Sequence, residues 1–184
     1  MVISYVGAGG KTTTIHQMAD MLVNNGATVA ITTTTHMYKE ENTVLGSRED
    51  VIERIKKRGW CIFGAEDKED KRKIVFPGYD FCEFIKEKAD YLLVEADGSR
   101  HKPAKFPRAY EPVIYKGSDR IILVTSIKAL GHKVKDVVHG YKEACRQFGI
   151  SEDTKVDARL LCRIIDEGYI KRLQVEPEIV ITEL

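Results

Sequence analysis

A glycine-rich loop near the amino terminus carries the residue types best suited to chemistry. It follows the short apolar run 2–6 directly. Glycines let a loop turn tightly and aim several backbone N–H groups at an anion, and the threonine-rich stretch that follows opens a helix whose N-terminal dipole favours negative charge. We therefore expect a loop that binds the phosphates of a nucleoside triphosphate. Its residues would be Gly7, Ala8, Gly9, Gly10, Lys11, Thr12 and Thr13.

Two residues of this loop have distinct expected roles. The Lys11 ammonium would reach the β- and γ-phosphates, and the Thr12 hydroxyl would bind Mg²⁺. Tyr5 stands where the full G-x-x-x-x-G-K-[ST] pattern has its first glycine, so the loop is of the shorter G-x-x-G-K-T kind. The alternative is an ordinary strand-to-helix turn with Lys11 in solvent. A lysine in a first helical turn opposes the helix dipole unless an anion is present, which favours phosphate binding.

A second group of polar residues follows the apolar run 92–94. Glu95 and Asp97 stand in the segment Glu-Ala-Asp-Gly-Ser-Arg, directly after that run. Open α/β sheets bind ligands at the carboxyl ends of their strands. A carboxylate at that place beside a phosphate loop holds Mg²⁺ directly or through water. We therefore expect Thr12, Glu95 and Asp97 to hold the metal; the alternative is an ordinary Asp-Gly turn.

Two further residues are candidates for catalysis. His36 ends the run Thr-Thr-Thr-Thr-His, which would lie near the phosphates, where His36 could orient a water or bind a substrate group. Arg100 begins a basic loop that also contains Lys102 and Lys105; it could neutralise transition-state charge, and the lysines could bind an anionic substrate. The candidate catalytic residues are therefore Lys11, Glu95, Asp97, Arg100 and His36.

Composition restricts the class of protein. The chain has 184 residues, of which 43% are hydrophobic, and its 29 basic and 28 acidic side chains give a net charge of +1. The length fits one domain, 1–184, and the balanced charge gives no field that would attract nucleic acid or an anionic membrane. No apolar run approaches the roughly 18 residues of a membrane span, and the four cysteines form no C-x-x-C pair. We expect a cytoplasmic protein with reduced thiols.

The alternation of apolar runs and helical patterns predicts an α/β fold. We expect a three-layer, P-loop NTPase-like arrangement, in which a mostly parallel sheet has helices on both faces. Segments 60–63 and 73–76 would form a small hairpin or edge insertion. Strands are expected at 2–6, 28–33, 60–63, 73–76, 91–94, 119–124 and 178–182, and helices at 12–24, 48–57, 79–88, 134–148 and 155–167.

Several motifs occur together in a fixed order. They are Gly-Ala-Gly-Gly-Lys-Thr-Thr-Thr, Thr-Thr-Thr-Thr-His-Met, Glu-Ala-Asp-Gly-Ser-Arg with Pro103, Lys105 and Glu111-Pro112, then Ala-Leu-Gly131 and Val-His139. From residue 2 to about 140 this order resembles the selenium-dependent hydroxylase accessory proteins, the YqeC family. The resemblance implies a P-loop NTP-binding protein associated with the maturation of selenium-dependent molybdenum hydroxylases, whose cofactor is a molybdopterin. The implied partner is such a hydroxylase or its cofactor precursor.

The leading hypothesis is a Mg²⁺-dependent protein that binds and hydrolyses ATP or GTP. The bound nucleotide would order the loops after 28–33 and 91–94 and thereby change the affinity for a partner. The basic loop offers a place for the phosphate of a pterin cofactor. One alternative is an ATP-dependent ligase or kinase that acts on a small acid, and another is a nucleotide-binding module without turnover. The chain contains no Asn-Lys-x-Asp motif, so the sequence leaves the choice of base open.

Overall fold

The computed structural model describes residues 1–173 and 176–183. The chain divides into two compact units, each assembled from separate stretches of sequence. The first unit consists of Met1–Tyr5, Thr12–Asp97 and Val113–Arg120, and the second of Val6–Lys11, Gly98–Pro112 and Ile121–Leu184. The chain passes from one unit to the other after Tyr5, Lys11, Asp97, Pro112 and Arg120. We describe each unit by itself.

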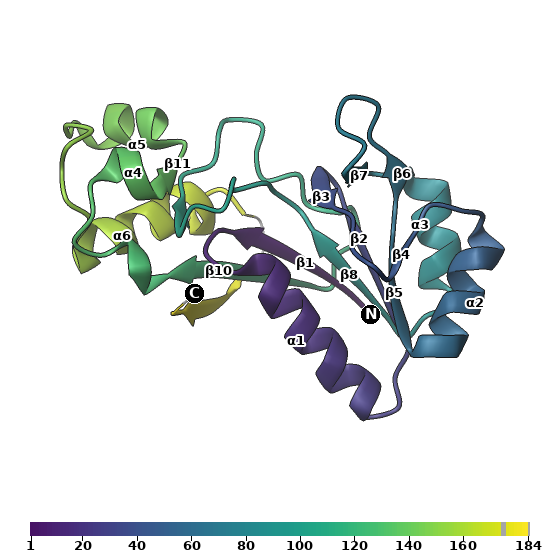
Figure 1. Cartoon of the computed structure of the whole chain (residues 1–184). Helices are drawn as coiled ribbons and strands as arrows, with labels where there is room; N and C mark the ends of the chain where they lie inside the picture. Colours follow the sequence, from purple (N-terminus) through teal and green to yellow (C-terminus); the bar gives the residue numbers. More distant parts are fainter. Residues whose placement is uncertain (174–175, 184) are drawn as a thin grey trace. The chain divides into compact units, whose positions relative to one another are not determined.

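A parallel sheet forms the centre of the first unit. Its strands in spatial order are β1 (Val2–Gly7), β8 (Tyr91–Glu95), β2 (Val29–Thr33), β5 (Trp60–Phe63) and β4 (Thr43–Val44). Every neighbouring pair among them is parallel. The helices are α1 (Lys11–Asn24), α2 (Arg48–Arg58) and α3 (Tyr79–Lys86). Figure 1 shows α1 on one side of these strands and α2 with α3 on the other.

Strands β1, β2 and β8 are buried along nearly their whole length, as expected for a parallel sheet that is covered on both faces. One face packs against α2 and α3, and the fully buried side chains of the opposite face include Ile31 and Leu93. Helix α2 starts at a capping box between Ser47 and Asp50 and ends at Gly59, which has a φ of 79°. These end signals agree with the helix expected at 48–57.

The first unit also contains a second sheet, which is antiparallel. It consists of β3 (His36–Tyr38), β7 (Lys73–Val75) and β6 (Ala65–Glu66), in that order. The expected pairing of 60–63 with 73–76 is wrong, because β5 pairs in parallel with β2 and β4 while β7 pairs with β3 and β6. The run Trp-Cys-Ile-Phe is buried from its second residue onward, as a central strand requires.

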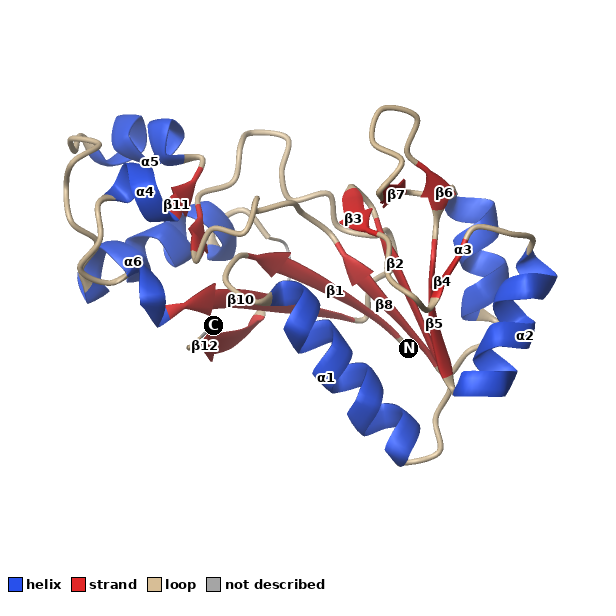
Figure 2. Cartoon of the chain, in the orientation of Figure 1, coloured by secondary structure: helices blue, strands red, loops and turns tan. Residues whose placement is uncertain are grey.

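The second unit contains the remaining strands and helices (Figure 2). Strand β10 (Arg120–Ser126) lies between the end of β1 and β12 (Glu178–Thr182), and β12 runs parallel to β10. A short parallel pair, β9 (Ala104–Lys105) with β11 (Val138–His139), packs with the helices around a core that includes Phe106 and Leu160. The elements are β9 (Ala104–Lys105), β10 (Arg120–Ser126), a 3₁₀ turn (Ile127–Ala129), α4 (Val134–Val137), β11 (Val138–His139), α5 (Tyr141–Phe148), α6 (Ala158–Ile165), a π-helical turn (Asp166–Ile170) and β12 (Glu178–Thr182).

The single helix expected at 134–148 is wrong, because strand β11 divides it into α4 and α5. Gly140 explains the break. Its φ is 77°, and a Cβ at this position would lie 2.1 Å from the carbonyl oxygen of Phe106. The helix expected at 155–167 begins later, at Ala158, where the Asp157 carboxylate accepts a hydrogen bond from the Leu160 N–H and caps it.

The structure therefore confirms an α/β fold with a mainly parallel central sheet flanked by helices. Within the described part of the chain, every helix is too short or too polar to cross a membrane.

Candidate functional site

The glycine-rich loop has a backbone that only glycine adopts without strain at several positions. Gly7, Gly9 and Gly10 have φ values of 93°, 75° and 110°. A Cβ at Gly7 would lie 2.1 Å from the carbonyl oxygen of Val124. The next residue, Ala8, donates its N–H to that same oxygen at 2.8 Å. The end of β1 is thus held against β10 within the second unit, and the loop turns from there.

A second loop, Gly98–Pro103, lies against the glycine-rich loop within the second unit. The Gly9 N–H donates to the carbonyl of Lys102 at 3.0 Å, and the Ser126 N–H donates to the carbonyl of Pro103, also at 3.0 Å. The Thr182 hydroxyl on β12 donates to the carbonyl of Gly9. The expected phosphate loop is therefore fixed from two sides.

Lys11 is the buried cation of this loop. Only 3% of the residue is exposed. Its Nζ donates to the carbonyl of Gly7 at 2.7 Å, and the Ser99 hydroxyl lies 3.5 Å from Nζ. The ammonium therefore folds back over the turn that Gly7 begins, which contradicts the alternative of a lysine extended into solvent.

Thr12 and Glu95, two of the expected metal ligands, meet in the first unit. The Thr12 hydroxyl donates to Glu95 Oε2 at 3.0 Å. Glu95 is 8% exposed and Asp97 is fully buried. The carbonyl of Glu95 accepts hydrogen bonds from the Thr33 hydroxyl at 2.8 Å and the Thr34 N–H at 3.1 Å. The threonine run that ends β2 therefore holds the residue that ends β8.

The side chains of this group carry oxygen atoms of the kinds that bind magnesium. Mg²⁺ prefers hydroxyl, carboxylate and water oxygens, and it binds through one or two carboxylates together with substrate phosphates. Thr12, Glu95 and Asp97 supply such oxygens. The described residues contain no cluster of three or more histidine, cysteine or acidic side chains that could hold a metal ion.

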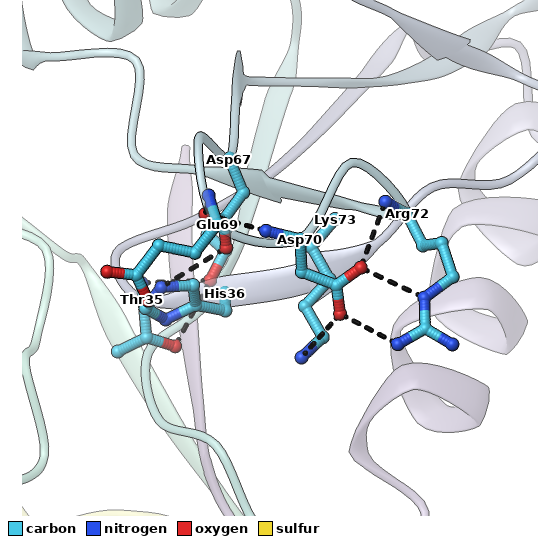
Figure 3. Close-up of polar contacts among 8 residues, drawn as sticks. Thr35, His36, Asp67, Glu69, Asp70, Arg72 and Lys73 are labelled. Atoms are coloured by element: carbon cyan, nitrogen blue, oxygen red, sulfur yellow. Dashed lines mark hydrogen bonds and ion pairs between the residues drawn. The ribbon is translucent and has the colours of Figure 1, made fainter.

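His36 lies in the three-stranded sheet of the first unit, where it contacts an aspartate (Figure 3). Its Nε2 lies 3.5 Å from Asp67 Oδ2, and 62% of its side chain is exposed. The backbone N–H groups of Glu69 and Asp70, with the nearby His36, hold the pKa of Asp67 below its ordinary value despite its burial. The observed contacts of His36 are thus with the 65–75 segment, and its expected role near phosphates stays a prediction.

The other candidate side chains differ in exposure. Arg100 and the next residue, His101, are both exposed, and both have left-handed backbones, with φ values of 49° and 59°. Such φ values are uncommon for residues other than glycine and occur often at functional loops.

Thr13 is exposed on α1. The Lys102 ammonium donates to the carbonyl of Asp136.

Lys105 has a different environment from the one expected for an anion-binding lysine. Its side chain is fully buried, and its Nζ lies 3.1 Å from Glu111 Oε1. Nζ also donates to the carbonyl of Gly98 at 2.6 Å. Because Glu111 already neutralises this ammonium, Lys105 is a poor site for a substrate anion. Sequence reasoning missed this ion pair and the position of Ser99 beside Lys11; the spacing of Lys105 and Glu111 within one loop was the available signal for the pair.

The ion pair predicts a specific dependence of stability on pH. Burial alone would raise the pKa of Glu111, but the Arg108 N–H and the Lys105 ammonium bring it below the ordinary 4.5. The carboxylate therefore contributes stability that is present above about pH 4.5 and is lost as pH falls through the lowered pKa of the folded state. We expect Glu111→Gln to be less stable at pH 7.

Thermal unfolding between pH 3 and pH 7 measures this effect. The difference between wild type and Glu111→Gln should shrink as the pH falls below about 4.5. The exposed Glu41, replaced by glutamine, is the matched control. A difference that stays constant over the whole pH range would contradict the role given to the Glu111 charge.

Comparison with known proteins gives the family. Residues 3–142 match the family described as YqeC protein. A protein of Escherichia coli (strain K12), named "Uncharacterized protein YqeC", is 31% identical over 171 residues, which cover 89% of this chain and 67% of that protein. The matched region contains the glycine-rich loop, the Glu95–Arg100 segment and the Lys105–Glu111 pair. The chain belongs to the YqeC family.

Proposed function

We propose that this protein binds ATP or GTP together with Mg²⁺, hydrolyses it, and acts as an accessory protein in the maturation of selenium-dependent molybdenum hydroxylases. The observation that carries the nucleotide part is the position of Lys11. A nearly buried ammonium sits over a turn of three glycines with positive φ, at the start of helix α1. A cation at a helix N-terminus is unfavourable by itself and favourable once an anion binds between it and the helix.

The residues after Lys11 support the metal part of the proposal. The Thr12 hydroxyl donates to Glu95 Oε2, and this hydrogen bond orients both oxygens. When bound, Mg²⁺ would supply positive charge to the phosphate oxygens. Glu95 in turn is held through its carbonyl by Thr33 and Thr34. Arg100 would add positive charge from the loop that contacts Gly9.

The maturation role rests on the resemblance of the ordered motifs to the accessory proteins, together with membership of the YqeC family. A nucleotide-dependent change in loop order is an established way to change affinity for a protein partner. The direct test is binding of a purified molybdenum hydroxylase apoenzyme in the presence of Mg²⁺ and a non-hydrolysable nucleotide. Binding that is equal with and without nucleotide would contradict the proposed switch.

Release of inorganic phosphate tests the hydrolysis. We expect release from ATP or GTP that requires Mg²⁺ and falls at least about tenfold in Thr12→Ala, because that variant loses a metal ligand. Thr154→Ala is the matched control. It makes the same substitution in the second unit, at a position far in sequence from Thr12 and Glu95. Release that depends on an added small acid would favour the ligase or kinase alternative, and tight binding without release would favour the binding module.

A further inference from the structure

The Lys105–Glu111 ion pair places two charged side chains in the interior of the second unit. Removing two charged groups from water is costly, and a buried ion pair seldom stabilises a protein more than well-packed apolar side chains of similar volume. The contacts that the pair makes with its surroundings indicate a role beyond stability. Lys105 Nζ donates to the carbonyl of Gly98 at 2.6 Å.

Gly98 opens the loop that faces Lys11. It follows Asp97 directly and precedes Ser99, whose hydroxyl lies 3.5 Å from Lys11 Nζ. The Lys102 N–H donates to the carbonyl of Ser99 at 3.1 Å and closes the turn. Lys105 is thus the side chain that ties the start of this turn to strand β9.

The turn needs such a tie because its backbone is strained. Arg100 and His101 both have positive φ, a conformation that is unfavourable for residues other than glycine. Strained backbone persists only where the surroundings fix it. Here Gly9 binds the far end of the turn through the Lys102 carbonyl, and Lys105 binds its near end through Gly98.

We propose that Lys105 is a positioning residue, which holds the Gly98–Pro103 loop against the glycine-rich loop so that Ser99 and Arg100 stay beside the phosphates. Its functional consequence rests on the proposed nucleotide hydrolysis. Glu111 keeps Lys105 in place, and the Arg108 N–H, which donates to Glu111 Oε2 at 3.0 Å, keeps Glu111 in place. The ammonium acts through the backbone of Gly98 and does not itself bind the phosphates.

Two variants separate positioning from stability. Lys105→Met removes the ammonium and leaves the Glu111 carboxylate partly buried without it, so the protein should lose stability. Lys105→Met with Glu111→Gln removes both charges and keeps an oxygen for the Arg108 N–H, so its stability should return close to that of the wild type. Lys171→Met, which removes the exposed ion pairs of Lys171 with Asp166 and Glu167 in the second unit, is the control.

The stable double variant gives the decisive comparison. We expect its kcat for nucleotide hydrolysis to fall about tenfold or more, with KM changed less than about threefold, because the misplaced loop affects the reaction more than binding. We also expect faster hydrogen exchange at the amides of Gly9 and Lys102, whose hydrogen bonds depend on the loop. A double variant that regains wild-type kcat and wild-type exchange together with its stability would overturn the proposal. If the wild type hydrolyses no nucleotide, the proposed function fails, and the exchange rates still decide whether Lys105 holds the loop.

Discussion

Replacing Lys11 by alanine is expected to remove most of the affinity for a nucleoside triphosphate. The ammonium is nearly buried over the glycine turn, and a hydrogen bond between charged groups contributes about 2 kcal/mol or more, roughly 30-fold in affinity. The free energy of unfolding of the same variant shows how much of the change comes from the folded state itself. Equilibrium binding of a fluorescent nucleotide analogue, with unfolding measured in parallel, gives both quantities.

Lys57→Ala is the control for this variant. Lys57 is an exposed lysine in the last turn of α2, so its loss removes the same charge from a position far from the loop in sequence. We expect unchanged nucleotide affinity for it. Equal affinities of Lys11→Ala and wild type would contradict the assignment of Lys11 to the phosphates.

The second large effect is expected from Gly9→Ala, which should destabilise the second unit and abolish nucleotide binding. Gly9 has a φ of 75°, and its Cβ would lie 2.5 Å from both the Pro103 carbonyl oxygen and the Ser126 Cβ. The left-handed backbone costs about 1–2 kcal/mol, and the overlap with fixed backbone adds about 1–3 kcal/mol. Denaturant unfolding should therefore show a loss of about 3 kcal/mol.

Gly26→Ala separates these two costs. Gly26 also has a positive φ, 84°, but no atom lies within 4 Å of the position of its Cβ. We expect this control to lose only about 1 kcal/mol and to keep nucleotide binding. If both glycine variants lose the same stability, the overlap of a Cβ at Gly9 with its neighbours does not contribute to the free energy of unfolding, which would contradict this account.

The sequence predicts the elements whose signals are local. Strand β1, helix α1 and strand β8 lie within two residues of their expected limits, because apolar runs and helix-end residues define them. The choice of strand partner was wrong for Trp60–Phe63. A short apolar run is compatible with a hairpin and with a buried parallel strand, and only long-range contacts, such as the Asn42 carbonyl that accepts the Ile62 N–H, decide between them.

The candidate site divides in the same way. The carboxyl ends of parallel strands lie at one edge of a sheet, so the sequence could predict that Thr12 and Glu95 would meet. The sequence could not predict side-chain contacts that depend on tertiary packing. Nothing local indicates that His36 would contact Asp67, because that contact depends on the pairing of β3 with β7.

Calorimetric titration of the wild-type protein with ATP and with GTP, each with and without Mg²⁺, tests the central claim most directly. The account predicts binding of at least one of the two in the micromolar range that weakens strongly when Mg²⁺ is removed, because Thr12, Glu95 and Asp97 would hold the metal together with the phosphates. The same titrations choose between adenine and guanine. The absence of binding by both nucleotides in the presence of Mg²⁺ would contradict the account.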